Sequence, residues 1–130
     1  MTRDRLTDAR TLLRAHRYCA AYYMSGYAVE CALKSCISKR INRHDFPDKK
    51  LINDSYTHDL AKLVSTADLK GMLELAYAAD KDLERNWEIV RDWSAEDRYN
   101  LNISKKQARD LYSAITERPA GVLTWLRNHW

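Results

Sequence analysis

Two residues of opposite charge interrupt the most apolar stretch of this chain. Glu30 and Lys34 lie one helical turn apart within residues 21–37, which are otherwise almost entirely apolar or aromatic. A charge buried among apolar neighbours is costly unless it is paired, and Glu followed by Lys at i+4 is the favoured orientation. Tyr23 and Tyr27 share the same helical stripe. The pair is interpreted either as a structural brace or as the polar wall of a groove for RNA or a nucleotide.

A second set of candidate residues lies late in the chain. Arg91 and Arg98 could bind phosphate, because a guanidinium contacts phosphate oxygens in a bidentate manner. Tyr99 and Asn100 follow Arg98 directly and complete the candidate phosphate-binding or RNA-binding set. The alternative for both arginines is an ion pair with a nearby carboxylate, and the candidates are Asp92, Glu96 and Glu30.

The histidines and cysteines provide no recognisable catalytic or metal-binding pattern. His58 precedes Asp59 at the start of a predicted helix, where a capping or surface role is favoured over a catalytic one. The cysteines, which are odd in number, include no CxxC pair and are expected to be buried thiols in a reducing compartment; they are Cys19, Cys31 and Cys36. We therefore assign no catalytic residue, no metal site and no cofactor from the sequence.

Helical periodicity dominates the pattern of apolar residues. No strand-like alternation and no Asn-Gly or Asp-Gly hairpin competes with it. The predicted architecture is all-α, an up-down bundle of four to six helices with a long, buried central helix, in a single domain over residues 1–130. The expected helices cover residues 3–16, 18–39, 58–64, 68–93, 104–117 and 119–128, with a long polar loop of unassigned role at 40–56. Weak points in the fourth helix are expected at Gly71 and at Ala79-Asp80, and Ser104 is the predicted cap of the fifth.

Composition excludes several classes of protein. The 130 residues are 45% hydrophobic and 31% charged, which argues against disorder. No run reaches the roughly 18 uncharged apolar residues of a membrane span, and the N-terminus does not resemble a signal peptide. We expect a cytoplasmic protein with no membrane association. The net charge of +4 permits an acidic partner such as RNA without establishing one.

Three segments of the chain resemble the HEPN family of small helical domains. The first is Gly-Tyr-Ala-Val-Glu followed by Ala-Leu-Lys, at residues 26–34. The second is the His-Asp-Leu of residues 58–60, which opens a helix. The third is the Trp-x-x-Glu-x-Arg-Tyr of residues 93–99. The resemblance implies a homodimeric helical bundle associated with RNA or nucleotides in toxin–antitoxin or defence systems. It also implies a minimal nucleotidyltransferase or an antitoxin as a possible partner.

The chain departs from the catalytic members of that family. They carry Arg, four to six residues, and then His near the start of a late helix, where the imidazole moves a proton and the guanidinium holds phosphate. The late region here has arginines but no histidine, and Asn100 stands about where that base is expected. The one literal match, Arg10 and His16, lies in the first predicted helix. Its two side chains are about 600° apart along that helix, so they point in different directions.

Three functions follow as hypotheses. The favoured one is a non-catalytic or weakly catalytic HEPN protein that binds RNA, a nucleotide or a partner protein. The second is a metal-independent ribonuclease toxin with a divergent active site. The third is a structural, dimerising subunit of a nucleotidyltransferase complex.

Overall fold

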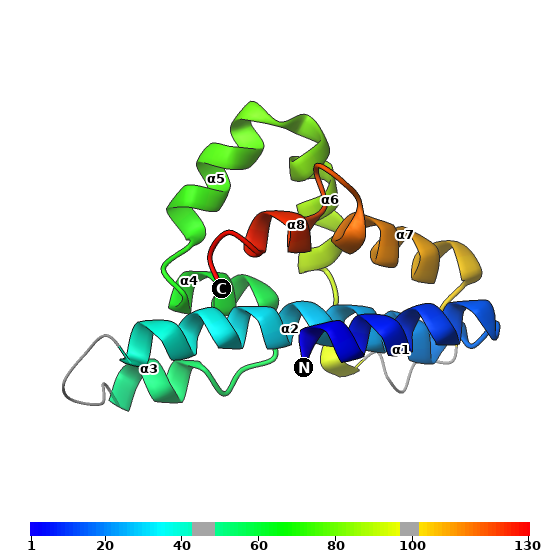
Figure 1. Cartoon of the computed structure of the whole chain (residues 1–130), viewed down its shortest axis with the longest axis horizontal. Helices are drawn as coiled ribbons and strands as arrows, with labels where there is room; N and C mark the ends of the chain where they lie inside the picture. The colour runs from blue at the N-terminus through cyan, green and yellow to red at the C-terminus, as the bar shows by residue number, and fades with distance from the viewer. Residues whose placement is uncertain (43–48, 97–101) are drawn as a thin grey trace.

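The computed structural model describes residues 1–42, 49–96 and 102–130. These residues form eight α-helices and no strand, which confirms the all-α bundle predicted from the periodicity (Figure 1). Within the same ranges, none of the helices combines the length and apolar character that a bilayer crossing requires.

The long central helix is α2, Tyr18–Asn42. It is apolar on all sides because other elements cover it on all sides. The helix α1, Thr2–Arg14, lies along one side of α2 (Figure 1). The other helices that pack against it are α3 (Lys49–Asp54), α4 (Leu60–Thr66), α7 (Lys105–Thr116) and α8 (Val122–Leu126). Leu33 and Ile37 are almost completely buried at the centre of this core.

The predicted single helix over 68–93 is wrong, because the chain forms two helices there. α5 covers Lys70–Ala79 and α6 covers Lys81–Arg91. Asp80 between them is extended, and its side chain accepts hydrogen bonds from the backbone N–H groups of Asp82 and Leu83. An aspartate that caps a new helix therefore separates the two, at one of the weak points expected from the sequence.

The region 40–56, predicted as a loop, contains more helix than expected. α2 continues to Asn42, and α3 covers Lys49–Asp54. Leu51 is buried and anchors this short helix to the core. The remaining residues of the predicted loop, 43–48, lie outside the described part of the chain.

The two ends of the late helices differ in how well the sequence predicted them. Ser104 caps α7 as expected, and a reciprocal bond between Gln107 and the Ser104 backbone completes a capping box. The last helix begins at Val122 rather than at the predicted Pro119. The backbone of Gly121 lies so close to that of Glu117 that a Cβ at position 121 would be 2.3 Å from the Glu117 oxygen. This tight turn delays the start of α8.

Candidate functional site

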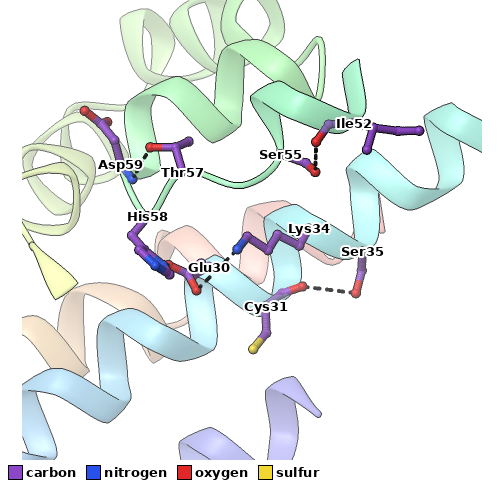
Figure 2. Close-up of polar contacts among 9 residues, drawn as sticks. All are labelled: Glu30, Cys31, Lys34, Ser35, Ile52, Ser55, Thr57, His58 and Asp59. Atoms are coloured by element: carbon purple, nitrogen blue, oxygen red, sulfur yellow. Dashed lines mark hydrogen bonds and ion pairs between the residues drawn. The ribbon is translucent and has the colours of Figure 1, made fainter. Parts of the chain in front are cut away.

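The buried carboxylate of Glu30 is the centre of the site. The Glu30 side chain is 3% exposed, and its Oε1 accepts a 2.6 Å hydrogen bond from Nδ1–H of His58 (Figure 2). The second oxygen, Oε2, lies 3.7 Å from Nζ of Lys34. The predicted pairing of Glu30 with Lys34 is therefore present, and His58 is a second and closer partner. Both partners are more exposed than the carboxylate that they share.

The chain before α4 places His58 opposite α2. Asp59 is the N-cap of α4 and accepts a hydrogen bond from the Lys62 N–H, while Thr57 Oγ1 accepts one from the Asp59 N–H. With these bonds made by its neighbours, the His58 side chain turns toward Glu30 (Figure 2). The capping role considered for His58 is thus wrong: the cap is Asp59.

The contact with Glu30 determines which nitrogen of His58 is free. An ionised carboxylate only accepts hydrogen bonds, so Nδ1 must carry the proton. In the neutral imidazole, Nε2 then keeps its lone pair as an acceptor. The His58 side chain is 60% exposed, so an oriented imidazole is presented at the surface by a buried acid. The same arrangement orients the histidine of catalytic triads.

Trp93 and Gly26 bring the end of α6 against α2. Trp93 is 3% exposed, and a Cβ at Gly26 would fall 2.1 Å from its indole ring. Tyr23 extends the aromatic layer, with its ring 6.1 Å from that of Trp93, and Tyr27 stacks on Tyr23 at 6.0 Å. The Trp93 Nε1–H is buried without a hydrogen-bond partner among the described residues, so it is a spare donor beside the surface.

His58, Arg91 and Trp93 line one surface pocket of about 280 Å³. The carboxylates of Asp59 and Glu96 line it as well. A neighbouring pocket of about 300 Å³ is formed by α4, α5 and α6 and shares Asp59 and Arg91 with the first. It adds two ammonium groups and two aromatic rings, those of Lys62, Lys70, Tyr77 and Trp87. We call the two adjoining pockets the Arg91 groove.

Arg91 is the cation that the two pockets share. It is exposed, and it makes no ion pair with any residue in the described ranges. The pairing with Asp92, Glu96 or Glu30 that the sequence suggested is therefore not formed within this part of the chain. Its guanidinium is available to a ligand in the groove.

The other predicted site residues lie apart from the groove or outside the described chain. Glu30 and Lys34 are not among the described residues that line its two pockets, so Glu30 reaches the groove only through His58. Arg98, Tyr99 and Asn100 fall within the segment that the structure does not describe. Of the candidate set, the structure thus connects Glu30 with Arg91 by way of His58.

Sequence reasoning missed His58 as a site residue. A usable signal existed, because one partly exposed lysine leaves half of a buried carboxylate without a partner. His58 was the only histidine placed beside a capping aspartate at a predicted helix start. Lys62, Lys70 and Tyr77 carried no such signal, because their place in the groove depends on how α4, α5 and α6 pack.

The thiol and phenol beside Glu30 are held in their neutral forms. Burial raises the pKa of the Cys31 thiol. The pKa of Tyr27 is raised as well, first by the charge that Cys31 would carry and then by burial. Cys36 is buried, and burial also raises its pKa, whereas Cys19 and Cys31 are only half-buried rather than buried as expected. All three cysteines are free, and no group of three potential metal ligands occurs among the described residues.

The three segments that carry the HEPN resemblance meet at this site. Glu30 belongs to the first, His58 to the second and Trp93 to the third; Glu30 contacts His58, and Gly26 of the first segment contacts Trp93. No protein-family model, curated protein or solved structure matches the chain.

Proposed function

We propose that the protein is a HEPN-type domain that binds RNA or a nucleotide in the Arg91 groove. One observation carries the proposal: an exposed arginine without an acidic partner in the described chain lines the same pocket as an imidazole held by a buried carboxylate. The convergence of the three HEPN-like segments at this pocket supports the family assignment.

The chemistry of the groove suits a nucleotide better than a bare anion. Arg91 can bind a phosphate with two parallel hydrogen bonds. Glu96 accepts hydrogen bonds, and a ribose hydroxyl or a base amino group can donate them. Tyr77, in the neighbouring pocket, offers an aromatic ring on which a base can stack. Mixed charges and an aromatic wall are therefore expected to select a ligand that carries phosphate, hydroxyl and base together.

Binding is favoured over cleavage because the family's late Arg-x4-6-His pattern is missing. The biological setting belongs to the same proposal: a cytoplasmic homodimer that works with an antitoxin or a minimal nucleotidyltransferase. Light scattering tests the dimer directly, and a monomer at working concentration would remove that part.

The test compares two arginines of α6. Arg91→Gln removes the groove cation, whereas Arg85→Gln removes an exposed arginine that pairs with Asp82 on the same helix. Binding of AMP is measured by calorimetry, and binding of a labelled 20-nucleotide RNA by fluorescence anisotropy. A hydrogen bond to a charged group contributes about 1.5–3 kcal/mol, so Arg91→Gln should weaken AMP binding about tenfold or more. Arg85→Gln should bind like the unmodified protein. Equal binding by both variants would reject the groove.

A second candidate function, RNA cleavage without metal, is favoured by the Glu30–His58 contact. His58 Nε2 could accept the proton of a ribose 2′-hydroxyl as the 2′-oxygen forms a bond to phosphorus. The bond from phosphorus to the 5′-oxygen then breaks, and the leaving oxygen takes a proton back from the imidazolium. Arg91 would stabilise the charge that develops on the phosphate.

The two functions are separated by one assay. RNA is incubated with the purified protein and with His58→Gln, Glu30→Gln and Arg85→Gln variants. Cleavage by the unmodified protein and by Arg85→Gln, lost in the other two variants, would support the second function. RNA that stays intact with every variant would leave binding as the function.

A further inference from the structure

The outer surface of α1 carries a row of arginines. Arg3, Arg10 and Arg14 are all exposed. At about 100° per residue, the three positions fall within an arc of about 40° on the helix. With a rise of about 1.5 Å per residue, they extend over about 16 Å along its axis. We call these three residues the α1 arginine row.

The acidic residues of α1 lie on a different side of the helix. Asp4 and Asp8 are about 100° and 140° from Arg3 around the axis, and Asp8 is paired with Arg5 at 3.3 Å. None of the three arginines in the row has an ion pair with a described residue. Their positive charge is therefore not compensated by the described part of the chain.

The row also includes an unfavourable contact within the helix. Arg10 and Arg14 are at i and i+4, where two like charges destabilise a helix by a few tenths of a kcal/mol. An acidic residue at either position would have relieved the repulsion. A solvated helix face gains nothing from this arrangement, whereas a surface that binds a polyanion does.

The packing of α1 leaves this row open along its whole length. Ala9 is fully buried and Leu6 packs against the core, so the opposite side of α1 is the one held by the bundle. α1 lies along α2 at the near surface of the molecule (Figure 1). A rod-like ligand could follow the helix without meeting another described element on that side.

We infer that the α1 arginine row binds the phosphodiester backbone of a nucleic acid, independently of the Arg91 groove. Guanidinium groups bind phosphate oxygens in a bidentate manner, and a linear row of exposed cations matches a linear array of phosphates. Backbone contacts of this kind carry no sequence information and give strongly salt-dependent binding. A membrane surface is a poorer match, because an interfacial helix needs a free apolar face and the apolar face of α1 is used by the bundle.

The experiment measures affinity against salt concentration for a 20-nucleotide oligo(U) RNA and a 20-nucleotide oligo(dT) DNA, with polyglutamate as a non-nucleic polyanion. The variant Arg10→Gln/Arg14→Gln is compared with Arg85→Gln/Arg118→Gln, which removes the same charge from exposed arginines elsewhere. Each lost contact to a single strand lowers the salt slope by about 0.7, so the row variant should lose about 1.4 and bind roughly tenfold more weakly, or worse, at 50 mM salt. The control should keep the unmodified slope, and the tighter oligomer identifies the natural nucleic acid.

Four results would overturn the inference: no oligonucleotide binding at 50 mM salt, an unchanged slope in the row variant, an equal loss in the control, or equally tight binding of polyglutamate. The melting temperature separates binding from folding, because relief of the Arg10–Arg14 repulsion should leave the row variant at least as stable as the unmodified protein. Loss of AMP binding in Arg91→Gln with an unchanged row effect concerns the groove alone. The absence of AMP binding in the unmodified protein would reject the groove and leave the row standing.

Discussion

The backbone of Gly26 lies directly against the indole of Trp93. A Cβ on residue 26 would be 2.1–2.3 Å from three ring atoms, closer than any real side chain can approach. Trp93 follows Arg91 by two residues, so this contact fixes the end of α6 on α2 and, with it, one wall of the groove. The smallness of residue 26 is a requirement of packing between two helices.

Gly26→Ala should therefore destabilise the fold. The added methyl group must displace a buried ring, and overpacking of this kind costs about 1–3 kcal/mol. The free energy of unfolding, measured by urea denaturation, should fall by that amount.

Gly71→Ala provides the control, because it makes the same chemical change in α5, where a Cβ would meet nothing within 4 Å. There, alanine should raise stability by about 0.4–1 kcal/mol through its better helix propensity. If the two variants changed stability in the same direction, the close contact at Gly26 would not be the cause.

The bond between Glu30 and His58 should be worth more than a surface ion pair. A double-mutant cycle with Glu30→Gln and His58→Gln should give a coupling energy of about 1–2 kcal/mol, because the carboxylate is buried while the imidazole is partly solvated. The reference is the exposed Arg5–Asp8 pair, for which the cycle should give about 0–0.5 kcal/mol. A coupling no larger than the reference would mean that Glu30 does not hold the imidazole.

Stability should decrease at alkaline pH in a way that depends on two thiols. Burial raises the pKa of Cys31 and of Cys36, so the folded protein keeps these protons more tightly than the unfolded chain does. Their contribution is complete below the ordinary thiol pKa of about 8.5 and is lost as the pH rises through the raised folded values. Urea midpoints at pH 7.5 and pH 10 should therefore differ more for the unmodified protein than for Cys31→Val/Cys36→Val. Equal differences would count against the thiols.

The parts of the fold that local pattern controls were predictable from the sequence. A helix that is apolar on every side, as α2 is, has to be buried, and Ser104 followed by Gln107 is a local capping signal. The break at Asp80 was harder, because good helix formers continue on both sides and the apolar spacing continues through it. Asp80 was the visible signal, since aspartate is a strong N-cap residue.

The site was predictable only in part, for a physical reason. The Glu30–Lys34 contact is local and follows from helical spacing, whereas Glu30 and His58 are 28 residues apart and meet only when α4 packs on α2. The groove likewise needs α4, α5 and α6 in place before Lys70 and Arg91 share a pocket. Sequence spacing shows which residues are chemically capable, and the packing of the helices shows which of them work together.

The most direct test of the proposed function observes His58 while a nucleotide is added. Nitrogen-15 labelling of the histidines allows the His58 Nε2 resonance to be followed by NMR during a titration with AMP. The account predicts a saturable shift of that resonance in the unmodified protein and in Arg85→Gln, and a shift that requires about tenfold more AMP, or more, in Arg91→Gln. A His58 resonance that stays unchanged up to millimolar AMP, or that shifts equally in both arginine variants, would contradict it.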